Sequence, residues 1–258
     1  MRRTLRPHAV LLDFGGVLVD VVPQPLGLVE VASEVHELLR KSGANSLGPY
    51  RIERDVRAGW QAYDDWKRAQ NRRAEPREIA HREFWEDFVG ADWPPAAHEV
   101  LVAHATPLCE RIDVATKDRP PREGSLELLR RLRELGIPTA VVSNALAGAA
   151  SRQLQRRYGF AEYLGAQVYS DEVGMRKPNP GIFAKAAAEL GVALGDCWYV
   201  GDTLDRDVLG ARRAGVGRVI LLPSTETERG IDVVARPDDV IRRPSDVLRL
   251  LPIELARS

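Results

Sequence analysis

Short apolar runs recur along the chain, and the first of them introduces the pattern. Residues 9–12, AVLL, are followed at once by Asp13 and then by the glycine pair Gly15 and Gly16. A short apolar run that stops at a glycine turn is typical of a buried strand in a parallel sheet. Further runs of this kind lie at residues 138–142, 166–168, 197–200 and 218–222. Segments with helical spacing alternate with them at residues 126–135, 146–158, 180–190 and 204–214, and a short helix is expected near 246–251. This alternation predicts an α/β fold with a doubly wound parallel sheet.

A long stretch after the first strand has a different pattern. Its apolar residues recur at helical spacing, and we expect helices at residues 26–41, 52–69, 77–89 and 96–109. No strand is expected between residues 22 and 109. We therefore interpret residues 21–117 as an all-helical domain inserted into a discontinuous α/β core of residues 1–20 and 118–258.

Aromatic side chains gather in the inserted segment. Trp60, Tyr63, Trp66 and Trp85 could line a pocket for a sugar or an aromatic group. The same stripe at helical spacing is more typical of the core of a helical bundle. We favour the core interpretation and keep the pocket as the alternative.

Charge and cysteine content exclude several classes of protein. Lys+Arg and Asp+Glu both total 37 in 258 residues, so net charge gives no argument for binding nucleic acid or an anionic membrane. The two cysteines, 109 and 197, form neither a disulfide framework nor a CxxC metal site. The first apolar run stops at Asp13, too early for a signal peptide or a spanning helix, and we expect a cytoplasmic protein. The oligomeric state is not indicated.

The basic residues are nearly all arginine. Lysine occupies only positions 41, 67, 117, 177 and 185. A lysine at a chemically sensible position therefore carries more weight in this chain than it would elsewhere. The histidines at 36, 81, 98 and 104 lack the spacing of metal ligands, and we assign them no role.

Polar residues follow the ends of several expected strands. Ser143 and Asn144 follow the second strand, Lys177 stands before Pro178 and a helix, and Asp202 and Asp207 follow the strand at 197–200. Each alone is commonplace, as a helix cap or a surface charge. Because the carboxyl ends of parallel strands share one edge, these residues should meet Asp13 there. Carboxylates beside a lysine and a helix N-terminus suit Mg²⁺ and a phosphoryl group, which predicts phosphoryl transfer.

Four segments carry a family resemblance. DFGGVL, VVSNA, GMRKPNPGIF and VGDTLDRDVLGARRAG resemble the ordered motifs of the haloacid dehalogenase superfamily of hydrolases, and the helical insert resembles the cap of its phosphatase-like branch. The similarity covers most of residues 8–222. It implies a Rossmann-like core and a reaction through an aspartyl-phosphate. The dehalogenase branch is a poorer match, because its metal-free chemistry does not call for an acidic cluster.

The resemblance also implies roles for single residues. Asp13 would attack phosphorus. Ser143, the backbone of Asn144 and the glycine turn at Gly16 would bind the phosphate, and Lys177 would neutralise its charge. The Mg²⁺ ligands would be Asp13, the Gly15 carbonyl and Asp202, with Asp207 either ligating the ion or orienting Lys177.

One position departs from the family pattern. The family usually has a second aspartate two residues after the nucleophile, as general acid and base, and here that residue is Gly15. Loss of such a group typically costs a factor of about 10²–10⁴ where it is needed. Asp20, Asp171 and Glu172 are candidate replacements by sequence proximity. The leading hypothesis is a Mg²⁺-dependent phosphomonoester hydrolase acting on a small phosphorylated metabolite. The alternative is a binding or regulatory protein weakened by Gly15, although a pure binder needs no nucleophile.

Overall fold

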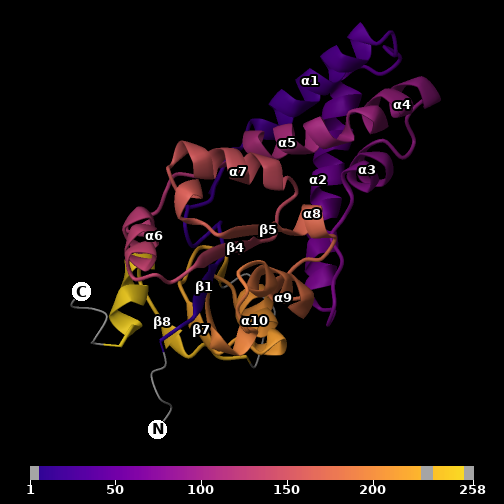
Figure 1. The fold of residues 1–258 in the computed structure, drawn as a ribbon. Helices are drawn as coiled ribbons and strands as arrows, with labels where there is room; N and C mark the ends of the chain where they lie inside the picture. The colour runs from indigo at the N-terminus through magenta and orange to yellow at the C-terminus, as the bar shows by residue number, and fades with distance from the viewer. Residues whose placement is uncertain (1–5, 228–234, 253–258) are drawn as a thin grey trace.

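The core of the protein is a six-stranded parallel sheet. The computed structural model describes residues 6–227 and 235–252. The strand order is β5-β4-β1-β6-β7-β8, and every neighbouring pair is parallel (Figure 1). The strands are β1 (Ala9–Leu12), β4 (Thr139–Ser143), β5 (Ala166–Tyr169), β6 (Cys197–Gly201), β7 (Arg218–Leu221) and β8 (Asp239–Val240). The chain winds outward from β1 in both directions, so the strand order reverses beside β1, where open α/β sheets bind their ligands.

Both faces of the sheet are covered, and β1 supplies side chains to each. Val10 and Leu12 pack into the same apolar cluster as α6 (Ser125–Glu134), together with the short helix Pro244–Leu250. Ala9 and Leu11 pack into the opposite cluster with α9 (Pro180–Glu189) and α10 (Leu209–Ala214). This alternation follows from the two-residue period of a strand, and burial on both faces explains why β1 is apolar throughout. The predicted α/β fold is confirmed.

The helical insertion stands to one side of the sheet, drawn in indigo to magenta in Figure 1. Its helices are α1 (Gly27–Lys41), α2 (Pro49–Asn71), α3 (His81–Glu83), α4 (Pro95–Ala103) and α5 (Ala105–Ala115), and α3 continues as a π-helix over Phe84–Val89. It has an apolar core of its own. The chain enters and leaves it through an antiparallel ribbon of β2 (Val22–Pro23) and β3 (Lys117–Asp118). The expectation of no strand between residues 22 and 109 is wrong at β2, because two residues are too few to leave an alternating pattern.

Two expected helices of the insertion differ from the structure. The helix expected over 77–89 begins only at His81, because the preceding residues pair with the core: the Glu78 N–H donates to the Gly174 carbonyl at 3.0 Å. The helix expected over 96–109 is two helices that meet at His104. Pro107 lies just beyond that break, and since it has no N–H it cannot continue the hydrogen-bond ladder of α4.

The remaining elements complete the core. They are α7 (Gly148–Arg157), the single turn α8 (Ser170–Val173), short 3₁₀ turns at Ala161–Tyr163 and Leu194–Asp196, and a π-helix over Leu204–Val208 that leads into α10. The helix expected over 204–214 therefore starts in π geometry. Within the described ranges, no helix combines the length and the apolar character needed to cross a membrane.

Candidate active site

A cavity of about 340 Å³ lies between the carboxyl end of the sheet and the helical insertion. We call it the central cavity. The core lines it with Asp13, Gly15, Ser143, Asn144, Lys177 and Asp202. The insertion and its ribbon line it with Trp60, Tyr63, Asp64, Lys67, Asp113 and Lys117, and Arg119 lines it directly after the ribbon. The predicted meeting of strand-end residues is therefore present in the structure.

Lys177 joins two carboxylates at the floor of the cavity. Its ammonium lies 2.7 Å from Oδ2 of Asp13 and 2.7 Å from Oδ1 of Asp207, and it also donates to the Tyr199 hydroxyl at 2.9 Å. Burial alone would lower the pKa of Lys177, but the charges of Asp13 and Asp207 outweigh it and raise that pKa. The lysine is thus a fixed cation at this site.

Asp13 sits directly after β1 and is held from two sides. Its Oδ1 accepts a hydrogen bond from the Phe14 N–H at 2.7 Å, while its Oδ2 faces Lys177. Burial raises the pKa of Asp13, against the lowering effect of the Lys177 charge. A buried carboxylate with a fixed geometry and a cationic partner is suited to nucleophilic attack on an anionic phosphoryl group.

Both carboxylate oxygens of Asp207 accept hydrogen bonds within the protein. Its Oδ1 accepts from Lys177 and, at 2.6 Å, from the Tyr199 hydroxyl. Its Oδ2 accepts from both the N–H and the hydroxyl of Thr203, at 3.0 and 2.5 Å. Asp207 was expected either to ligate the metal ion or to orient Lys177. This network favours the second role.

Asp202 has one carboxylate oxygen in a hydrogen bond and one without. Its Oδ2 accepts from the Ser224 hydroxyl at 2.5 Å, whereas its Oδ1 is buried without a hydrogen bond. Burial, together with the negative charges of Asp207 and Asp13, raises the pKa of Asp202 to about 8. Oxygens of Asp13, Asp202 and Asp207 lie within 4.8 Å of one another. Oxygen ligands in such a cluster fit a hard cation such as Mg²⁺, which would also satisfy the buried oxygen of Asp202.

Comparison with protein families agrees with that geometry. The sequence model of the haloacid dehalogenase-like hydrolase family matches residues 7–215. The chain belongs to the haloacid dehalogenase-like hydrolases. The resemblance seen in the four sequence motifs is confirmed.

Relatives of this hydrolase include named phosphatases. A glyceraldehyde 3-phosphate phosphatase from Methanopyrus kandleri is 41% identical over 96 residues, which is 37% of this chain and 41% of that protein. A phosphoglycolate phosphatase from Neisseria meningitidis is 27% identical over 208 residues, covering 81% of this chain and 77% of that protein. The solved structure of a HAD phosphatase from Thermococcus onnurineus has the same fold, with a TM-score of 0.58 and 20% identity over 94% of this chain and 96% of that one.

Two strand-end residues of this haloacid dehalogenase-like hydrolase lie at the cavity as expected. Ser143 ends β4 and lines the cavity, and it contributes to lowering the pKa of Asp13. The Asn144 side chain binds both backbone groups of Lys177: its Nδ2 donates to the carbonyl at 3.0 Å, and its Oδ1 accepts from the N–H at 2.7 Å. Asn144 therefore also positions Lys177, a role that strand-end reasoning did not foresee.

The two glycines after Asp13 differ in their surroundings. Gly15 lines the cavity, but Gly16 does not. The Gly16 N–H donates to the Val19 carbonyl at 2.8 Å and its carbonyl accepts from Arg122, so both groups have partners within the protein. The phosphate contact expected of Gly16 stays a prediction. What Gly16 provides is space for Asp202.

None of the three candidate replacements for the missing acid lines the cavity. Asp20 is exposed and lies 3.4 Å from Arg122. Asp171 accepts from the Gly148 N–H at 2.9 Å, and Glu172 pairs with Arg152 at 2.6 Å. Sequence proximity was a poor guide here, because each of these carboxylates already has a partner elsewhere.

The aromatic stripe belongs to the core of the insertion, and two of its residues also reach the cavity. Trp85 and Tyr63 are buried in the core of the insertion, and Trp60 and Trp66 pack against it. Trp60 and Tyr63 also line the cavity. The charged residues of the insertion that face the cavity were missed by the motif reasoning, and the scarcity of lysine was the only signal for them.

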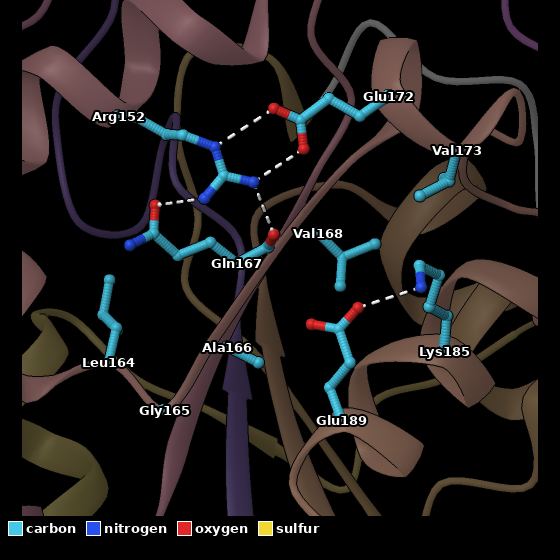
Figure 2. Close-up of a pocket in the computed structure, with 10 residues that line it drawn as sticks. All are labelled: Arg152, Leu164, Gly165, Ala166, Gln167, Val168, Glu172, Val173, Lys185 and Glu189. Carbon is cyan, nitrogen blue, oxygen red and sulfur yellow. Dashed lines mark hydrogen bonds and ion pairs between the residues drawn. The ribbon is translucent and has the colours of Figure 1, made fainter.

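A second pocket, on the outer side of the sheet at β5, is built from paired charges (Figure 2). Arg152 pairs with Glu172 and donates to the Gln167 carbonyl at 3.0 Å, and Lys185 pairs with Glu189 at 3.0 Å. Its charged groups thus neutralise one another, and it contains none of the strand-end residues. This pocket is not the active site.

Proposed function

We propose that the protein is a Mg²⁺-dependent phosphomonoester hydrolase that acts on a small phosphorylated metabolite. The observation that carries the proposal is the buried Asp13–Lys177 pair at 2.7 Å beside the partnerless oxygen of Asp202. The names of the relatives, which include phosphatases of phosphoglycolate and of glyceraldehyde 3-phosphate, support a small phosphorylated substrate.

Asp13 is the nucleophile in this proposal. A carboxylate oxygen of Asp13 attacks phosphorus, the bond between phosphorus and the leaving oxygen breaks, and an aspartyl-phosphate forms on Asp13. Water then hydrolyses that acyl phosphate, which releases inorganic phosphate and restores the carboxylate. Lys177, held by Asp207 and Asn144, neutralises charge on the phosphoryl oxygens, and Ser143 with the Asn144 backbone binds those oxygens.

The metal would be held by Asp13, Asp202 and the Gly15 carbonyl. When bound, Mg²⁺ supplies positive charge that offsets the repulsion between an anionic nucleophile and an anionic substrate. Asp207 acts through Lys177. The helical insertion, residues 21–117 in the sequence-based division, covers the cavity and contacts the leaving part of the substrate.

The test is hydrolysis of p-nitrophenyl phosphate by purified protein. We expect turnover with Mg²⁺, loss of turnover after chelation with EDTA, and recovery when Mg²⁺ is added back. No turnover of this ester, or of a panel of phosphorylated metabolites, with Mg²⁺, Mn²⁺ or Co²⁺ would overturn the proposal and favour a binding protein on this fold.

A further inference from the structure

Lysine is scarce in this chain, yet its positions converge in the structure. Lysines occupy five positions, 41, 67, 117, 177 and 185, among 37 basic residues. Three of these five, Lys67, Lys117 and Lys177, line the central cavity. Lys177 belongs to the site of phosphoryl transfer, which leaves Lys67 and Lys117 without a role. We call these two residues the lysine pair.

The lysine pair comes from two different elements. Lys67 lies on α2 and Lys117 on β3, fifty residues apart in the sequence. Their ammonium groups lie 5.8 and 5.5 Å from the centroid of the same Trp60 ring. Their side chains are 25% and 29% exposed, so a ligand in the cavity can reach both.

Nearby carboxylates do not balance the positive charge of this region. Lys67 pairs with Asp64 at 2.5 Å, and the Asp64 side chain is itself 34% exposed. Lys117 lies 3.5 Å from Oδ1 of Asp113, and that oxygen already accepts from Arg119 at 2.7 Å. Two lysines and Arg119 therefore share the carboxylates of Asp64 and Asp113. Lys117 has the longest ion-pair distance of the three cations.

Burial makes it costly to keep both lysines charged. Burial, with the like charge of Lys117, lowers the pKa of Lys67 to about 8 although Asp64 opposes the change. Burial also lowers the pKa of Lys117, although Asp113 opposes it. A bound anion would relieve the cost of holding both ammonium groups charged.

We propose that the lysine pair binds a second anionic group, carried on the part of the substrate that leaves. This inference rests on the proposed function and names its substrate class: short phosphomonoesters with a carboxylate or a second phosphate. Lys177 serves the phosphoryl group that is transferred, and the lysine pair serves the other end. A cavity of about 340 Å³ is at the small end of ligand sites, in keeping with a short substrate.

Matched substrates and matched variants test the proposal. The carboxylate arm compares phosphoglycolate with ethyl phosphate, and the phosphate arm compares propane-1,3-diol bisphosphate with propyl phosphate. In the native enzyme kcat/KM should favour the ester with the second anionic group in at least one arm by about 10- to 100-fold, the usual effect of a charged hydrogen bond. Lys67→Met and Lys117→Met should each remove most of that preference while changing kcat/KM for the simple alkyl phosphate by less than about 3-fold.

The control variant is Lys41→Met, which removes an exposed lysine on α1 that does not line the cavity, and it should keep the native preference. Activity on the simple alkyl phosphate shows that each variant is folded. Two results would overturn the proposal: no preference in the native enzyme for either ester with a second anionic group, or an equal loss on both members of a pair in the lysine variants.

A binding measurement separates this inference from the proposed function. Calorimetry with the non-hydrolysable probes phosphonoacetate and ethylphosphonate, in the presence of Mg²⁺, requires no turnover. Tighter binding of phosphonoacetate that depends on Lys67 and Lys117, in a protein that hydrolyses no ester, would support the lysine pair and refute the phosphatase. Hydrolysis of all the esters at equal rates would support the phosphatase and refute the role of the lysine pair.

Discussion

A β-carbon on Gly16 would lie 2.1 Å from Oδ2 of Asp202, closer than any two such atoms can approach. Gly16 also has a φ of +77°, in the left-handed region that favours glycine. The side chain of Asp202, after β6, therefore packs directly against the backbone of Gly16 in the turn after β1. The position of Asp202 depends on the absence of a side chain at residue 16.

We expect Gly16→Ala to displace Asp202 and to lower kcat/KM by at least ~100-fold, because a misplaced charged group in a site of this kind loses its electrostatic contribution. The control is Gly43→Ala: Gly43 has a similar φ of +74°, but a β-carbon there would meet nothing within 4 Å. That variant carries the backbone cost alone, about 1–2 kcal/mol of unfolding free energy, with native activity. Denaturant unfolding measures the free energy of unfolding, and steady-state kinetics measures kcat/KM. Native activity in a stably folded Gly16→Ala protein would contradict the packing argument.

Mg²⁺ should raise the melting temperature, and Asp202→Asn should abolish that increase. Binding to the folded state alone stabilises by mass action, and Asp202 supplies the buried oxygen that has no other partner. A matched control is Asp205→Asn: Asp205 is buried nearby but accepts a hydrogen bond from Asn71 at 2.9 Å and is outside the acidic cluster. Thermal unfolding with and without Mg²⁺ measures the effect. An unchanged Mg²⁺ shift in Asp202→Asn would place the cation elsewhere.

The missing acid at Gly15 should make the enzyme sensitive to its leaving group. With no acid at this position, an aryl phosphate, whose oxygen leaves without a proton, should be preferred to an alkyl phosphate. Gly15→Asp should reduce the ratio of kcat/KM for the aryl phosphate to that for the alkyl phosphate by about 10²-fold if the new carboxyl group acts as a general acid. The backbone at Gly15 is outside the left-handed region, and a β-carbon there would meet only the tip of Val21 at 3.2 Å, so the substitution is sterically mild.

The measurement is kcat/KM for a matched aryl and alkyl pair in both proteins at several pH values, after folding has been checked. Equal rates on both esters with a bell-shaped pH profile in the native enzyme would show that another residue already supplies the proton.

His81 should stabilise the protein more at low pH than at high pH. It lies where the insertion meets the core, 3.6 Å from Asp171, and its Nε2 lies 2.7 Å from the Leu146 carbonyl. The nearby Asp171 carboxylate raises the pKa of His81 above its usual value, burial opposes this, and the Leu146 carbonyl raises it further. A raised folded-state pKa means that the added stability is complete below about pH 6.5 and is lost as the pH rises through the folded value. Unfolding free energies of the native protein and His81→Gln from pH 5 to 9 should converge with rising pH. A constant difference would refute the linkage.

Elements with a local signal could be predicted from the sequence. The longer strands of the sheet are mostly apolar and are buried on both faces. Asp13 and Asp202 directly follow β1 and β6, and Ser143 is the last residue of β4. Their meeting at one edge is a consequence of parallel pairing. The edge strand β8 was missed because two residues leave no pattern, and residues 228–234, which precede it in the sequence, lie outside the described residues.

Features that depend on distant contacts could not be predicted. Glu78 and Arg176 are ninety-eight residues apart, yet both are buried and they pair at 3.1 Å. That contact draws residues 77–80 out of the helical pattern and onto the core. The lysine pair is a similar case, since no spacing rule relates Lys67 to Lys117.

The most direct test of the central claim is the rate of Mg²⁺-dependent p-nitrophenyl phosphate hydrolysis by Asp13→Asn, measured beside the native protein. Asparagine keeps the shape of the side chain and its oxygen acceptor for Phe14, so the variant should remain folded. Turnover should fall to the level of the uncatalysed control, because in the described structure Asp13 is the carboxylate that both follows β1 and contacts Lys177. Turnover above about 1% of the native rate, in a variant shown to be folded, would contradict the assignment of Asp13 as the nucleophile.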